Sequence, residues 1–147
     1  MKRLCILIIM AVIMIGTMTG CNTLTAAQRN AIENDRYVLR DSDSYRFTFR
    51  QSKRSPESCD MSFKLFYGVY TLYDLDVSEN ETVLIDFESV ATSGQFKTVI
   101  VTPEDEIVTL AEGNDKGKLS LNLTKGTYKI KIVGKDAQGS VAINLNY

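Results

Sequence analysis

Residues 119–132 read LSLNLTKGTYKIKI, and this stretch decides the fold class. Apolar side chains occupy every second position on both sides of Lys125-Gly126, and polar side chains fill the positions between them. Such alternation places one face of a strand on a core and the other face in water. Lys125-Gly126 supplies a turn, because glycine readily adopts the positive φ that such turns need. The stretch therefore predicts two strands of an antiparallel sheet.

The same alternation recurs in 45–50, 61–65, 83–88 and 141–147, and 96–101 is continuously apolar, as in a central strand. Turn compositions separate these runs at intervals close to 8–12 residues, which is typical of an all-β sandwich or barrel. We predict an all-β, antiparallel, jelly-roll-like β-sandwich of about eight or nine strands. The expected central core residues are Phe47, Phe63, Ile85, Phe87, Ile100, Leu121, Ile130 and Ile143.

The N-terminus has the layout of a secretory signal. Lys2 and Arg3 precede an uncharged apolar run over 4–15, which is too short for a comfortable membrane span. Met18-Thr19-Gly20-Cys21 follows and resembles the lipobox of bacterial lipoproteins, although leucine is more usual than methionine at its first position. The resemblance implies cleavage between Gly20 and Cys21 and a diacylglyceryl group on the Cys21 sulfur. The alternatives are an ordinary secretory signal with a chance cysteine, or an uncleaved anchor helix.

Three segments follow from these observations. Residues 1–20 are the expected signal peptide, 21–44 a lipidated N-terminus and tether, and 45–147 the β-sandwich domain. Thr25-x-x-Gln28 fits a capping box and predicts one short helix in the tether. The lipobox places the protein at a cell membrane, on the extracytoplasmic side.

The composition excludes several classes of binding and catalytic site. The chain has a net charge of −1, and the loss of Lys2 and Arg3 makes it about −3, which is not the balance of a nucleic-acid binder. The chain has no histidine, so a Ser-His-Asp or Cys-His catalytic site is excluded, and no glycine-rich phosphate loop is present. We therefore expect that the protein is not an enzyme and that it has neither catalytic residues nor a cofactor. The alternative is a small hydrolase that uses a pair of carboxylates.

Two sets of side chains are candidate binding residues. Arg50, Lys53 and Arg54 form a compact basic patch in an expected loop, which could contact anionic lipid headgroups or wall polymers. The alternative is a solvated hairpin loop. Tyr67 and Tyr73 share a strand face and could stack on a ligand, and the alternative for them is core or edge packing.

The sequence also offers candidate metal ligands and one free thiol. Asp74, Asp76 and Glu79 could supply oxygens to Ca²⁺, but their spacing is not that of an EF-hand loop. A solvated strand face explains them better, and we predict no metal site. After signal cleavage Cys59 has no intramolecular partner other than the lipid-bearing Cys21, so it is expected to be a partly buried apolar residue. A redox thiol is the alternative.

The segments 99–106, 123–128 and 132–134 are similar to the β-sandwich domain of small bacterial surface lipoproteins. They also resemble bacterial pre-peptidase C-terminal domains and some carbohydrate-binding modules. The resemblance implies a lipid-anchored envelope lipoprotein whose non-catalytic sandwich binds an envelope protein or a wall glycan. It carries over no ligand-binding residues, because the matched positions are turns and core.

Overall fold

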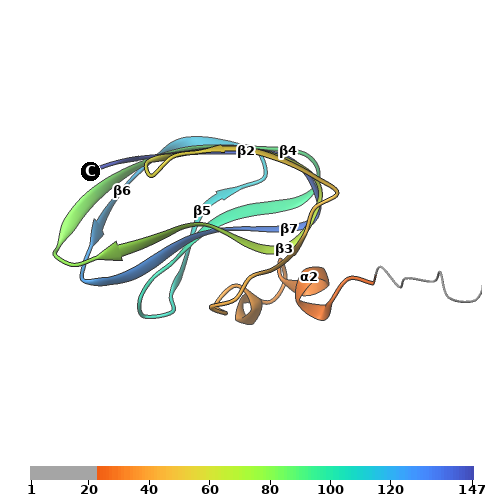
Figure 1. Ribbon diagram of the computed structural model, residues 1–147, viewed down its shortest axis with the longest axis horizontal. Coiled ribbons are helices and arrows are strands. Elements are labelled where there is room, and N and C mark those ends of the chain that lie inside the picture. Colours follow the sequence, from red (N-terminus) through yellow and green to blue (C-terminus); the bar gives the residue numbers. More distant parts are fainter. Residues whose placement is uncertain (1–22) are drawn as a thin grey trace, which may run out of the picture.

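Seven strands and two short helices account for residues 23–147, which are the residues that the computed structural model describes (Figure 1). The elements are α2 (Ala26–Asn30), the 3-10 helix η1 (Asp35–Tyr37), β1 (Ser44–Arg46), β2 (Phe49–Arg54), β3 (Ser58–Val77), β4 (Glu81–Val101), β5 (Ile107–Glu112), β6 (Asp115–Leu123) and β7 (Gly126–Asn146). The signal sequence, Gly20 and Cys21 lie outside the described residues. No helix within 23–147 has the length and apolarity needed to cross a membrane.

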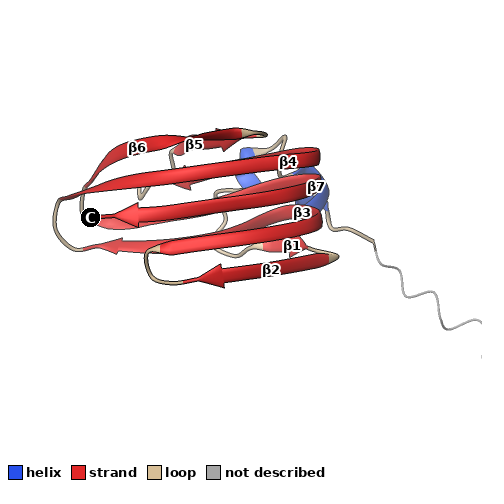
Figure 2. Ribbon diagram, turned by 90° about the horizontal axis from the view of Figure 1, so that it is seen from above, coloured by secondary structure: helices blue, strands red, loops and turns tan. Residues whose placement is uncertain are grey.

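Three long strands, β3, β4 and β7, run through both layers of an antiparallel sandwich (Figures 1 and 2). In one layer the strand order is β2-β3-β7-β4-β6, and in the other it is β1-β3-β7-β4-β5. We name these the β2–β6 layer and the β1–β5 layer, after their edge strands. The predicted all-β, antiparallel, jelly-roll-like fold is confirmed.

The number of strands differs from the expectation, because two predicted turns are bends inside continuous strands. Ser93-Gly94 bends β4 and residues 136–139 bend β7, and both strands continue from one layer into the other. Gly94 has φ 73°, and a Cβ there would lie 2.0 Å from the carbonyl oxygen of Asp136. At Gly139 a Cβ would lie 1.8 Å from the carbonyl oxygen of Val90. Glycine thus lets β4 and β7 stay paired around the bend.

The core lies between the layers and is made by the inward positions of the alternating runs. Of the expected core residues, five are at most 1% exposed and the other three pack against the core while partly buried. The five are Phe63, Ile85, Ile100, Ile130 and Ile143, and the three are Phe47, Phe87 and Leu121. Phe96 and Ile100 point into this core, whereas Val99 and Val101 belong to a second apolar cluster on the outer face. This explains why 96–101 is apolar throughout.

The second cluster forms where residues 23–43, here named the strap, pack on the outer face of the β1–β5 layer. Thr25 caps α2 with the expected capping box, completed by Gln28. Ala27, Ala31, Tyr37 and Val38 of the strap are buried against valines of β3, β4 and β7. The strap therefore forms a third layer on the sheet, where the sequence suggested a spacer with little apolar surface. The predicted boundary between tether and domain at residues 44 and 45 stays a prediction.

Candidate functional site

A shallow groove crosses the outer face of the β2–β6 layer, on the side opposite to the strap. Outward side chains of β2, β3, β7 and β4 line a depression of about 520 Å³. Smaller depressions of about 300 and 260 Å³ extend it toward β6 and toward the bends. The strands meet there only because their order in the sheet differs from their order in the chain (Figure 2).

One transverse row of the sheet gives the groove its charge pattern. Strand by strand, the paired residues are Lys53, Asp60, Ala142, Glu88 and Lys116. The two carboxylates thus flank the small Ala142, and a lysine lies beyond each of them. Neighbouring strands are about 4.8 Å apart, which puts the Cα atoms of Asp60 and Glu88 about 9–10 Å from each other. The row presents hydrogen-bond acceptors near its centre and donors at both ends.

The depression exists because the floor is made of small side chains. In the next row, Ser62 and Ser140 lie between Gln51 and Val90. Hydroxyl, amide and carboxylate groups therefore line the 520 Å³ depression, and Val90 is the main exposed apolar side chain within it, at 38%. Such a surface can donate and accept many hydrogen bonds, and it offers little apolar area to bury.

The three cations of the predicted basic patch do not lie on one face of the sheet. Arg50, Lys53 and Arg54 lie in the exposed edge strand β2, where the sequence suggested a loop. The guanidinium of Arg50 lies over the rings of Phe47 and Tyr70, at 5.3 and 4.9 Å from their centroids. Lys53 instead lines the groove. Alternation along β2 thus sends neighbouring cations to opposite faces, because successive side chains of a strand point in opposite directions.

The two candidate stacking tyrosines do not form one platform. Tyr73 is 5% exposed, its hydroxyl donates to the Ser55 carbonyl oxygen at 3.2 Å, and Arg54 lies over its ring. A ring this buried has no free face for a ligand, so for Tyr73 core packing replaces the stacking hypothesis. Burial raises the pKa of Tyr73 to about 12. Tyr67 lies near the bend of β7. Its pKa is raised, mainly by burial and secondly by the nearby Asp136 carboxylate.

Asp74 and Asp76 of the acidic segment lie on β3, opposite residues of β7. Asp76 Oδ1 accepts a hydrogen bond of 2.8 Å from Thr127 Oγ1, and Asp74 lies opposite Lys129 on β7. Within residues 23–147 no cluster of three or more histidine, cysteine or acidic side chains is suited to hold a metal ion.

Cys59 is a core residue. Its side chain is 1% exposed and packs among the apolar residues between the layers. Burial raises the pKa of the Cys59 thiol. This confirms the expectation of a small apolar role for this residue.

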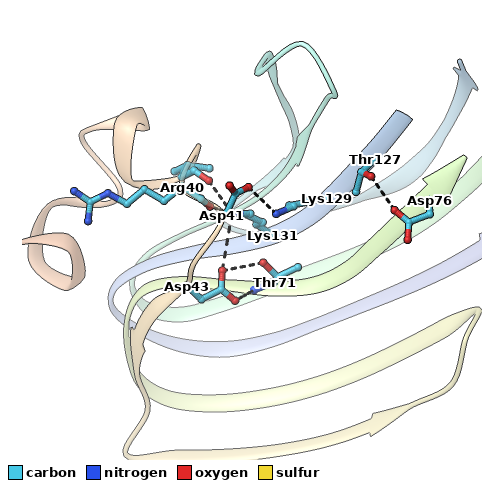
Figure 3. Close-up of polar contacts among 9 residues, drawn as sticks. Arg40, Asp41, Asp43, Thr71, Asp76, Thr127, Lys129 and Lys131 are labelled. Carbon is cyan, nitrogen blue, oxygen red and sulfur yellow. Dashed lines mark hydrogen bonds and ion pairs between the residues drawn. The ribbon is translucent and has the colours of Figure 1, made fainter. Parts of the chain in front are cut away.

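Lysines of the β1–β5 layer hold the strap through its acidic side chains, and Figure 3 shows two of them, Lys129 and Lys131. The four ion pairs, each given with the strap residue first, are Glu33–Lys135, Asp35–Lys97, Asp41–Lys129 and Asp43–Lys131. The carboxylates of the strap thus pair with lysines of the sheet.

Lys131 is the central contact among these lysines, and sequence reasoning misplaced it. Alternation put Lys131 on a water-facing strand face, but it is 1% exposed. Its ammonium donates to the carbonyl oxygens of Val38 at 2.9 Å and Arg40 at 2.7 Å, and Asp43 lies 3.9 Å away (Figure 3). Burial lowers the pKa of Lys131, and the nearby Asp43 carboxylate opposes that shift. The apolar outward residues Val99, Val101 and Val133 were the signal that something covers this face.

No family model and no curated protein matches the sequence. Similar solved structures include a carbohydrate-binding module from Cellvibrio mixtus lichenase 5A in complex with cellotriose, at 11% identity and a TM-score of 0.37, covering 76% of this chain and 93% of that one. The C-terminal carbohydrate-binding module of LamC from Zobellia galactanivorans is similar at 11% identity and a TM-score of 0.33, over 67% and 92% of the two chains.

A third similar structure is the enzymatically active domain of tailspike protein 4 from bacteriophage CBA120. Its identity is 13% and its TM-score 0.39, and the match covers 82% of this chain but 20% of that one. Likeness at these scores says nothing about function.

Proposed function

We propose that this protein is a lipid-anchored envelope lipoprotein whose sandwich binds a glycan in the groove of the β2–β6 layer. The anchor rests on the lipobox at 18–21, and the ligand class rests on the groove. The observation that carries the ligand class is the row in which Asp60 and Glu88 flank Ala142 between two lysines. Sugar hydroxyls both donate and accept hydrogen bonds, and this row offers partners for both.

A glycan fits this groove better than an envelope protein does. The buried centre of a protein interface is depleted of charged residues and enriched in aromatic side chains. Here the centre holds Ser62, Ser140 and Ala142 beside two carboxylates. A polar chain that lies along the small floor could use these groups without burying an unpaired charge.

The anchor is tested by cell fractionation of the Cys21→Ser protein. Each buried acyl methylene contributes about 0.8 kcal/mol, and two chains make attachment stable, so loss of the lipid should release the protein. If the variant still pelleted with membranes after a salt wash, the anchor would be wrong.

Glycan binding is tested by capture of the protein on purified cell-wall glycan and, in parallel, on envelope proteins. The doubly substituted Asp60→Asn, Glu88→Gln protein should lose at least tenfold in glycan affinity. The matched control is the pair Asp74→Asn, Glu104→Gln, which removes two carboxylates that lie outside the groove. Equal glycan binding by both double variants, or capture by envelope proteins alone, would overturn the glycan proposal.

The same carboxylates define the second candidate, a hydrolase. Carboxyl groups about 6.5–9.5 Å apart suit an inverting glycosidase, and the strand spacing puts the Cα atoms of Asp60 and Glu88 about 9–10 Å apart. Binding is favoured because Asp60 and Glu88 are both exposed in an open depression, where water is not excluded from the bond to be cleaved. Release of reducing ends from the bound glycan, abolished by either single substitution, would support hydrolysis instead.

A further inference from the structure

The end of the sandwich that carries the bends also gathers exposed apolar side chains. Within residues 23–147 the exposed large apolar residues are Tyr45, Phe49, Leu65, Val90, Val108 and Tyr147. Three of them lie where β3 passes from one layer to the other, because Tyr45 pairs opposite Gly68, Phe49 pairs opposite Lys64, and Leu65 follows Lys64. They are 42, 46 and 47% exposed. We name these three residues the apolar tip.

Leu65 is held outward by an unusual backbone. It lies at an irregularity between Phe63 and Phe66, where the pairing of β3 with β7 is interrupted. Its φ of 48° falls in the left-handed region, which leucine rarely adopts. The fold thus keeps a large apolar side chain half exposed at this irregularity.

The start of the strap is bonded to the same end of the molecule. Thr25 Oγ1 lies 3.2 Å from Ser44 Oγ, and Gln28 Nε2 donates to the carbonyl oxygen of Tyr45 at 3.0 Å. Figure 1 shows α2 and the bends at one end of the sandwich and the C-terminus at the other. Four residues of chain reach at most about 14 Å, so Cys21 cannot be farther than that from Thr25. A lipid on Cys21 would hold this end against the bilayer.

Two cations at this end have no carboxylate partner among residues 23–147. Arg29 and Lys64 are exposed, and neither makes an ion pair with any residue of the described chain. Nη1 of Arg29 donates to the carbonyl oxygen of Leu24 at 2.7 Å, which keeps its charge close to the chain that leads to Cys21. Unpaired cations beside apolar side chains match the interface of an anionic bilayer, where phosphates lie above the acyl region.

We infer that the apolar tip rests in the interface of an anionic bilayer, with Arg29 and Lys64 at the lipid phosphates. This inference rests on the proposed lipid anchor. Because only a short chain separates Thr25 from Cys21, a lipid on Cys21 would bring the bilayer to the apolar tip. The sandwich then stands with its C-terminal end away from the membrane.

The chain contains no tryptophan, so a single introduced indole reports its own surroundings. The lipidated Phe49→Trp protein is reconstituted into anionic vesicles that contain brominated lipids, which quench a nearby indole. Tyr147→Trp, at the other end of the molecule, is the matched control. We expect at least threefold stronger quenching of F49W than of Y147W, together with a blue-shifted emission.

Substitutions at the tip test its residues. In the F49W background, Leu65→Asn should at least halve the quenching, and the fold should survive because asparagine accepts a positive φ. Val108→Asn, at an exposed apolar site in β5, should leave quenching unchanged. The double change Arg29→Gln, Lys64→Gln should lower quenching on anionic vesicles only.

The outcomes separate the two proposals. If the protein floats with vesicles but F49W and Y147W are quenched equally, the apolar tip is wrong and the anchor stands. If wild type fails to float with neutral vesicles, the anchor is wrong and the tip inference falls with it. A blue shift that depends on protein concentration in detergent, without vesicles, would show that a second copy covers the tip and would overturn the inference.

Discussion

The ammonium of Lys131 donates a hydrogen bond of 2.9 Å to the carbonyl oxygen of Val38, and so ties the first part of β7 to the strap. The side chain is buried, and the contact joins residues 93 positions apart in the chain. A buried charge is tolerated only when it is paired and hydrogen-bonded, and the carbonyl oxygens of Val38 and Arg40 together with Asp43 meet that need.

Lys131→Met should therefore destabilise the fold. The change leaves two carbonyl oxygens without their donor. It also removes the ammonium nearest Asp43, whose carboxylate keeps its hydrogen bonds from Thr71. We expect a loss of about 2–4 kcal/mol in the free energy of unfolding. Urea denaturation measures it. Lys129→Met is the control, because Lys129 pairs with the exposed Asp41, and its loss should be below about 1 kcal/mol. Equal losses for both variants would contradict the role given to Lys131.

Gly139→Ala should be far more damaging than a glycine change in open space. A Cβ at Gly139 would lie 1.8 Å from the Val90 carbonyl oxygen, so β4 and β7 would have to separate at their bend. We expect a loss of about 3 kcal/mol or more. Gly113→Ala meets no atom within 4 Å and should lose only about 1–2 kcal/mol through its positive φ. Thermal denaturation of both variants compares them, and a harmless G139A would show that the bend is not closely packed.

Alkaline pH should weaken the fold through Tyr73. Its pKa is raised to about 12 in the folded state from an ordinary value of 10.0, so the folded state holds the proton more tightly. The resulting stability is fully present below pH 10 and is lost as pH rises toward 12. Tyr73→Phe should flatten this part of the profile of unfolding free energy against pH. An unchanged slope in Y73F would assign the alkaline loss to other groups.

Cys59 should be protected from thiol reagents in the folded protein. The thiol is 1% exposed and burial raises its pKa, so little thiolate is present and little of it can be reached. Alkylation at pH 8 should be at least 100-fold slower in buffer than in urea, with mass spectrometry as the readout. Comparable rates would mean that the core opens readily around Cys59.

Alternation in the sequence predicted the inward side chains well, because burial on one face of a strand leaves a period of two. It placed Ile85, Ile130 and Ile143 in the core, where they are at most 1% exposed. Alternation alone did not show that the outward face near Lys131 is covered, although the apolar outward residues Val99, Val101 and Val133 indicate a cover. That depends on the strap, whose burial comes from two alanines, a tyrosine and a valine that are unremarkable in sequence.

The groove was also beyond sequence reasoning. Asp60 and Glu88 are unremarkable outward acids, and they flank Ala142 only because β7 pairs between β3 and β4. The basic patch was visible as a cluster in sequence, but alternation along β2 turns Lys53 toward the groove and Arg50 toward the aromatic rings. Strand order and the direction of each side chain, which are tertiary properties, decide the site.

Because β3, β4 and β7 pass through both layers, the molecule cannot be divided into its two layers. No contiguous stretch of the gene encodes one layer, so neither layer can be deleted, exchanged or inherited alone. Hydrogen bonds of both layers depend on the same three strands, and the two layers should open to solvent as one cooperative unit. The groove on one face and the strap on the other therefore share a single folding equilibrium.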